Sequence, residues 1–233
     1  MPSNYTPLRI DFDIITPVRV PGHLFHLDGL IGWSMIEQRM RSGDNSMSPD
    51  EICKSLPIES IDLGDGEKLY KASAFVFTGS GDRQNLKLTR PCDYQQMALD
   101  QGEVFSGTRL KKWDPIVSSG FYKAYFLDEP LRLYDRASAW VVGDKEQITQ
   151  ALSLVENIGK LTRLDCGHVS SLTVTEDEKA FDLWRYRALN EKQEGYHAVY
   201  ETVTLPYYDK SKRIEAWIPS KKVEFSVIDY AFS

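Results

Sequence analysis

A short stretch with a glycine near each end carries residue types suited to binding phosphate. Glycine lets a backbone approach a ligand and adopt positive φ, and exposed N–H groups beside cations favour phosphate. The alternative interpretation is a glycine-capped connection between a helix and a strand, with solvated cations. The candidate residues in this stretch are Gly159, Lys160, Thr162, Arg163, Gly167 and His168.

A second group of basic residues lies in the weakly patterned stretch 79–114. Basic side chains with an aromatic ring nearby form a surface on which an unstacked base can lie. The alternative is a solvated face, because Asp82, Asp93, Asp100, Glu103 and Asp114 balance the charge. The candidates for nucleic-acid binding here are Arg83, Lys87, Arg90, Arg109, Lys111, Lys112 and Trp113.

Two histidines and two aspartates are the residues that most suggest enzymatic chemistry. His23 or His26 near an unperturbed pKa suits proton transfer, although His26 also fits a packing or capping role at a helix start. Asp11 and Asp13 share a strand face and have ligand oxygens for Mg²⁺, but no third acidic motif supports them. We therefore predict no catalytic residue and no metal site, and we interpret His168 as an RNA contact rather than a base.

Composition limits the classes of function. The 233 residues carry a net charge of −6, which argues against a surface covered in nucleic acid but leaves room for a local basic groove. The three cysteines lack CxxC spacing, as in reduced cytosolic proteins. Neither a signal-peptide pattern nor an apolar run of about 20 residues is present. The expectation is a cytoplasmic protein without cofactor or membrane contact.

Periodicity predicts the regular elements. Residues 8–15 alternate as a half-buried strand does. A helix follows, with Asp28 as its cap and Leu30, Trp33, Ile36 and Met40 on its core face. A second helix begins at Asp144 as N-cap, with Gln147 at the third helical position. Further strands are expected at 70–78, 121–127, 138–142 and 169–175, and in the tail at 196–204, 214–218 and 222–228.

This order predicts an α+β chain whose palm is a ferredoxin-like, RRM-like βαββαβ unit. The palm would span 1–178 and carry the glycine-rich loop and an inserted thumb at about 79–115. A β-rich C-terminal extension would span 179–233. In the RNA-recognition module with this topology, one face of the sheet carries RNA.

Several short motifs resemble the RAMP superfamily of CRISPR proteins. One is a strand that ends in Thr16-Pro17, before a helix that opens at residues 26–30. Another is the loop at 158–169, although Leu164-Asp165-Cys166 stands where a further glycine is often found. The segments 184–187 and 205–208 are similar to the tail of the Cas-five-like subunit of type IV CRISPR effector complexes.

The resemblance implies a non-catalytic guide-RNA-binding subunit that serves in antiviral defence or plasmid interference. Such a subunit caps the complex by holding the crRNA 5′ handle, and His26 joins the expected RNA contacts. Its partners would be the backbone (Cas-seven-like) and large (Cas-eight-like) subunits. Target DNA would pass nearby, and the subunit would assist PAM recognition. Two alternatives stay open: a metal-independent endoribonuclease that processes repeat RNA, and an assembly module whose neighbours hold the RNA.

Overall fold

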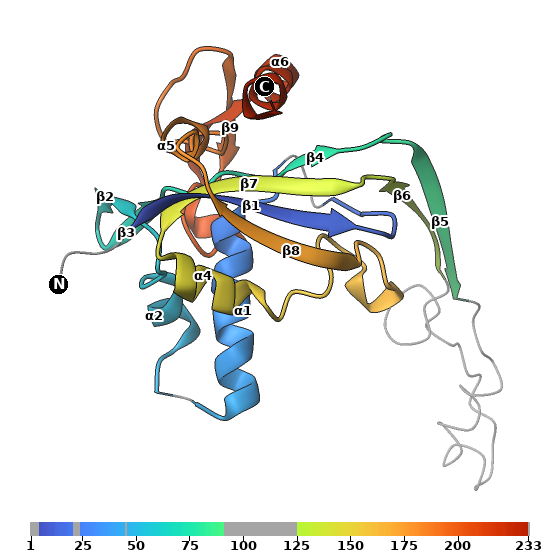
Figure 1. Ribbon diagram of the computed structural model, residues 1–233, viewed down its shortest axis with the longest axis horizontal. Coiled ribbons are helices and arrows are strands. Elements are labelled where there is room, and N and C mark those ends of the chain that lie inside the picture. The colour runs from blue at the N-terminus through green and yellow to red at the C-terminus, as the bar shows by residue number, and fades with distance from the viewer. Residues whose placement is uncertain (1–4, 21–23, 45, 91–124, 233) are drawn as a thin grey trace, which may run out of the picture. The chain divides into compact units, whose positions relative to one another are not determined.

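Four antiparallel strands form the main sheet of the computed structural model, which describes residues 5–20, 24–44, 46–90 and 125–232. They are β1 (Thr6–Ile14), β4 (Val76–Thr78), β7 (Arg136–Gly143) and β8 (Val169–Glu176), in the order β4-β7-β1-β8. The central strand β1 pairs with β7 on one side and β8 on the other. The first and last strands of this sheet along the chain are therefore neighbours (Figure 1).

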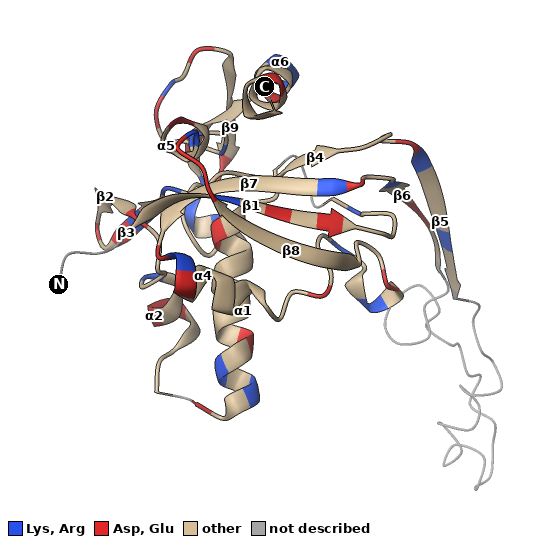
Figure 2. Cartoon of the chain, in the orientation of Figure 1, with Lys and Arg blue, Asp and Glu red and all other residues tan. Residues whose placement is uncertain are grey.

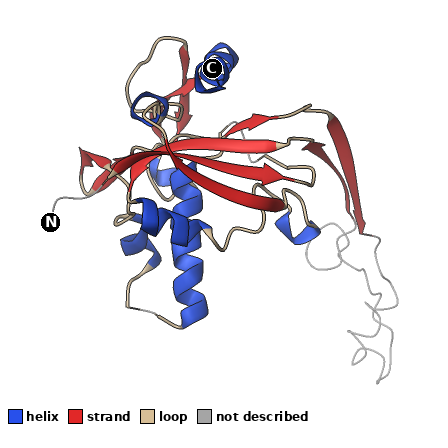
Figure 3. Ribbon diagram, in the orientation of Figure 1, coloured by secondary structure: helices blue, strands red, loops and turns tan. Residues whose placement is uncertain are grey.

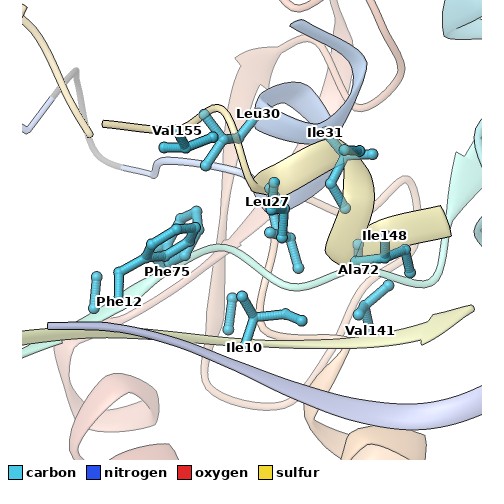
Figure 4. Close-up of a cluster of buried hydrophobic side chains, with 14 of the residues drawn as sticks. Ile10, Phe12, Leu27, Leu30, Ile31, Ala72, Phe75, Val141, Ile148 and Val155 are labelled. Atoms are coloured by element: carbon cyan, nitrogen blue, oxygen red, sulfur yellow. The ribbon is translucent and has the colours of Figure 1, made fainter. Parts of the chain in front are cut away.

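The helices between these strands cover one face of the sheet. They are α1 (Leu27–Ser42), the short α2 (Pro49–Cys53) and α4 (Lys145–Leu152), all on the same side in Figure 3. Leu8, Ile10 and Phe12 alternate along β1 and are fully buried against them, as Figure 4 shows for Ile10 and Phe12. The alternation predicted for β1 is therefore confirmed.

The C-terminal region packs on the opposite face of the sheet. It contains α5 (Ala180–Leu183), the paired strands β9 (Tyr196–Glu201) and β10 (Ile214–Pro219), and α6 (Lys221–Phe232). Trp140 of β7 is fully buried in a cluster with Leu183, Tyr186 and Ala231. Both faces of β7 are thus covered.

Two smaller hairpin-like pairs complete the described structure. β2 (Ser60–Gly64) pairs with β3 (Glu67–Tyr70), and β5 (Arg83–Arg90) pairs with β6 (Tyr125–Arg132). The chain separates into two compact units, Arg83–Leu131 and the remainder. Most of the expected thumb, residues 91–115, lies outside the described residues.

The tail differs from the prediction at its end, because residues 222–228 belong to a helix and not a strand. The Ser220 hydroxyl accepts a hydrogen bond from the Val223 N–H at 3.5 Å, as a helix N-cap does. Val223, Val227 and Ile228 contact the same core cluster, with the spacing of a helix face. The architecture is therefore mixed α+β with antiparallel sheets, and its extension is only partly β.

Helix α1 also departs from the prediction. Trp33 and Met40, expected in the core, are 49% and 68% exposed. The buried side is formed by Leu27, Ile31 and Ser34. His26 stands at the N-cap position, and its side chain makes no capping hydrogen bond. Asp28 is not the cap but is buried in the second position of the helix.

The other predicted boundaries are partly right. The stretch 70–78 is interrupted between β3 and β4, and the strand expected at 121–127 is described from Tyr125 onwards. Asp144 caps α4 by accepting a hydrogen bond from the Gln147 N–H at 3.0 Å, as predicted. No helix in the described part of the chain combines the length and the apolar character that crossing a membrane requires.

Candidate nucleic-acid interface

The glycine-rich loop is shaped by two glycines that no other residue can replace without a shift. Gly167 has a φ of +69°, and a Cβ there would lie 2.0 Å from the Ile158 carbonyl oxygen. Gly159 has a φ of +92°, and a Cβ there would lie 2.7 Å from the carbonyl oxygen of Arg19. Close backbone packing therefore explains both glycines without any ligand.

The loop is fastened to the segment that follows β1. The N–H of Lys160 donates to the Arg19 carbonyl at 2.7 Å, and that of Gly167 donates to the Pro17 carbonyl at 2.9 Å. Thr16 donates its hydroxyl to the Asp165 carbonyl at 2.6 Å and accepts from the His168 N–H at 2.7 Å. These backbone groups already have hydrogen-bond partners within the protein. A phosphate at these positions would therefore have to be bound by side chains.

Two of those side chains are cations that reach solvent. Lys160 and Arg163 are exposed, and neither side chain forms a hydrogen bond or ion pair with any residue that the structure describes. The nearby His168 is different, because its Nδ1 lies 3.2 Å from a carboxylate oxygen of Asp165. The 3₁₀ turn η2 (Thr162–Leu164) lies between residues of positive φ, Leu161 and Asp165, and it presents Thr162 and Arg163 to solvent.

A groove of about 620 Å³ separates this loop from the start of α1. Four residues predicted to bind RNA line it: His26, Gly159, Thr162 and Arg163. Lys160, Gly167 and His168 belong to the same loop but do not line the groove. Its apolar walls include Leu24, Phe25, Leu30, Trp33 and Leu154, and its polar lining includes Arg41, Glu156 and Asn157.

Next to the groove lies a buried polar network that joins α1 to the C-terminal region. Arg187, fully buried, lies 3.2 Å from the carboxylate of Asp28, which is 1% exposed. The Tyr207 hydroxyl donates to the same carboxylate at 2.8 Å, and Arg187 also donates to that hydroxyl. Further hydrogen bonds from Arg187 reach the carbonyls of Tyr70, Ala72 and Val203.

The network sets the protonation of its members. Burial opposes the charge of Arg187, but Asp28 and Tyr207 outweigh it and raise the pKa of the guanidinium. Burial raises the pKa of the Tyr207 hydroxyl well above its ordinary value, so the hydroxyl keeps its proton and donates it. Arg187 is thus a charged, hydrogen-bonded group inside the core.

His26 connects this network to the groove. Its ring stacks on Tyr207 with centroids 4.5 Å apart. Burial, followed by the charge of Arg187, lowers the pKa of His26 well below its ordinary value. The neutral ring accepts a hydrogen bond at Nε2 from the Ala188 N–H at 3.4 Å. Near neutral pH this histidine can therefore form a wall of the groove but holds no proton to give as an imidazolium acid.

The remaining predicted sites are placed elsewhere. Arg83 and Lys87 are exposed on β5, and the Nε of Arg83 donates to Asn85 at 3.0 Å. Arg90 ends the same strand. Arg109, Lys111, Lys112, Trp113 and His23 lie outside the described residues.

The paired aspartates of β1 are engaged by neighbouring side chains. Asp11 pairs with Arg9 at 3.0 Å, and Asp13 with Arg136 at 2.9 Å. Hydrogen bonds from Ser171 and Arg136 lower the pKa of Asp13. Among the residues that the structure describes, no three His, Cys, Asp or Glu side chains group as a metal site would.

Sequence reasoning missed the roles of Trp33, Tyr207 and Arg187. Helical spacing predicts Trp33 in the core, yet its indole is half-exposed beside the groove. Gly29, one turn earlier, offered a signal: a Cβ there would lie 3.3 Å from the Tyr207 ring. A glycine inside a helix marks close packing, but only the fold identifies the partner.

Comparisons with known proteins give one family. The protein-family model described as CRISPR type IV associated protein Csf3 matches residues 6–219 of the chain. A search of curated proteins finds no match.

Proposed function

Because the chain belongs to the CRISPR type IV associated Csf3 family, which supports the role of a CRISPR effector subunit, we propose that it binds guide RNA without cutting it. The contact region is the glycine-rich loop together with the adjoining groove. The observation that carries the proposal is that Lys160 and Arg163 are exposed and make no ion pair with any described residue, at the edge of a groove that Arg163 lines. Such cations are available to phosphates.

The order of strands supports a ferredoxin-like palm as the scaffold. A βαββαβ chain of that type places its first and last strands side by side, as β1 and β8 are here. In this proposal the helix side of the palm, and not its sheet face, binds the crRNA 5′ handle. On the sheet face, Asp11 and Asp13 engage Arg9 and Arg136 in ion pairs, so these two cations are less available to phosphates. Figure 2 displays the acidic positions on β1.

The absence of catalysis is part of the proposal. His26 is neutral, and one of its two ring nitrogens already accepts a hydrogen bond from Ala188. A metal-independent ribonuclease needs a residue that exchanges protons near neutral pH. The wall role of His26 therefore accounts for its position better than the endoribonuclease alternative does. The backbone and large subunits would contact other surfaces of this chain.

Charge reversal of the two cations tests guide binding. In Lys160→Glu/Arg163→Glu, the affinity of the full chain for repeat-derived guide RNA should fall. The slope of log K against log salt should decrease by about one for each lost phosphate contact. Lys221→Glu/Lys222→Glu, at exposed positions of α6, is the matched control and should keep both affinity and slope.

Two results would contradict the proposal. One is unchanged RNA affinity and salt slope in the loop variant, and the other is RNA crosslinks in the assembled complex that reach only other chains. Cleavage of repeat RNA in chelator, lost in His26→Ala, would establish the endoribonuclease instead.

A further inference from the structure

The groove beside the loop has the size and lining of a ligand site. Its volume of about 620 Å³ falls within the range of small-molecule pockets, which is roughly 300–1,000 Å³. Its lining combines apolar side chains, including the rings of Phe25 and Trp33, with polar and charged groups. An exposed indole beside such a groove is costly in water and is suited to a flat aromatic partner.

The aromatic wall is rigid on its inner side. His26 and Tyr207 stack face to face, and Tyr207 is fixed by its hydrogen bonds to Asp28 and Arg187. Gly29 leaves room for the Tyr207 ring against the helix. A preorganised wall costs less entropy to use on binding than a mobile one.

The polar groups of the groove match a nucleotide. Arg163 lines it and is available to a phosphate, as argued above. Among the described residues, none donates a hydrogen bond to the Glu156 carboxylate or to the Asn157 side-chain oxygen, since Asn157 uses only its side-chain nitrogen. These acceptors complement the N–H donors of a base edge or a ribose hydroxyl. A peptide segment would use the apolar walls but not this combination of cation and acceptors.

From these features we propose that one unpaired nucleotide of the guide RNA leaves the base stack and inserts its base into this groove. The base lies against Trp33, and its phosphate contacts Arg163. This proposal rests on the proposed function and names a specific subsite for it. Stacking of a base on an aromatic side chain is sequence-tolerant, so the acceptors would supply any preference among bases.

The test couples a protein change to an RNA change. Guide RNAs that each carry one abasic nucleotide, moved along the repeat-derived 5′ end, are titrated against the full chain. One position should weaken binding by about tenfold, the order of loss expected when one stacked base is removed. Trp33→Ala should cause a similar loss with intact RNA and no further loss with that abasic RNA, whereas Trp33→Phe should retain most of the affinity.

The controls separate folding, general RNA binding and other ligands. Met40→Ala changes another exposed side chain of α1 outside the groove and should bind every RNA as the unchanged protein does. Nucleoside monophosphates should compete only weakly, and equal affinity for them would instead indicate a free-nucleotide site.

The two proposals fail differently. If RNA binds through Lys160 and Arg163 but every abasic RNA binds equally, the groove proposal is wrong and the proposed function stands. If Trp33→Ala and the abasic position give independent, additive losses, the base does not lie on Trp33. If no guide RNA binds at all, both proposals fall.

Discussion

His26 lies at the N-terminal end of α1 in surroundings that favour its neutral form. Burial and the charge of Arg187 both lower its pKa. In the unfolded chain, a histidine takes up a proton near pH 6.5. Below that pH the unfolded state therefore binds more protons at this site than the folded state does, and folding loses stability.

This difference predicts how stability depends on pH. As the pH falls from 7 to 5, His26 should reduce the free energy of unfolding with a slope of at most about 1.4 kcal/mol per pH unit. In His26→Phe, which keeps a ring against Tyr207, that contribution should vanish, so the pH profile from urea denaturation becomes flatter. The same substitution at the exposed His197 controls for the added hydrophobic ring. Parallel profiles for the unchanged protein and His26→Phe would contradict a neutral His26.

Single residues were the part of the site that sequence reasoning placed least well. Lys160 and Arg163 could be singled out because exposed cations between glycines have a local meaning. Trp33 could not, because helical spacing alone makes an aromatic residue look like core. Trp33 lines a groove together with Tyr207 and the loop, and these segments come from distant parts of the sequence.

At the scale of elements, the Asp28–Arg187 pair joins the start of α1 to the C-terminal region. The two residues are 159 positions apart in sequence, and both are buried. Removing one partner of a buried pair leaves an uncompensated charge, whereas replacing both can be nearly neutral. No sequence pattern indicates this pair: Asp28 is predicted to be a helix cap, and residues 184–187 enter the sequence analysis only through the family resemblance.

A double-mutant cycle should expose this link. Arg187→Met alone should reduce the free energy of unfolding by about 3–5 kcal/mol. Asp28→Asn with Arg187→Met should recover a large part of that loss. Arg41→Met, which removes a partner of the exposed pair with Glu37, is the matched control and should change stability little. Additive losses in chemical denaturation would mean that the two side chains do not act as a unit.

Elements with local signals were predictable, and those that depend on tertiary packing were not. Asp144 and Gln147 define the start of α4 through hydrogen bonds within one turn. Residues 222–228 suggested a strand, but they form part of α6 because Val223, Val227 and Ile228 pack on one cluster. Short apolar segments are ambiguous between helix and strand until their partners are known.

At the scale of the whole molecule, the proposed RNA binding has to be compatible with a net charge of −6. The two faces of the main sheet carry different groups that RNA could contact. On one side, the guanidinium carbon of Arg9 in β1 lies 4.4 Å from the centroid of the Phe232 ring in α6. Asp11 and Asp13 lie on the same face of the sheet as Arg9. The glycine-rich loop and groove adjoin α1, whose helix covers the other side.

This arrangement predicts that RNA avoids the sheet face. Thr173 and Thr175 of β8 stand opposite Asp11 and Arg9 and are exposed, so Thr173→Glu/Thr175→Glu adds two negative charges there. RNA affinity should stay within about twofold, because exposed charges further apart than roughly 10 Å are largely screened at 0.1 M salt. The loop variant Lys160→Glu/Arg163→Glu carries a larger change of charge and should lose affinity. If instead the β8 variant weakens binding as strongly, or if photocrosslinks map to β1 and β8, RNA runs across the sheet as in the RNA-recognition module.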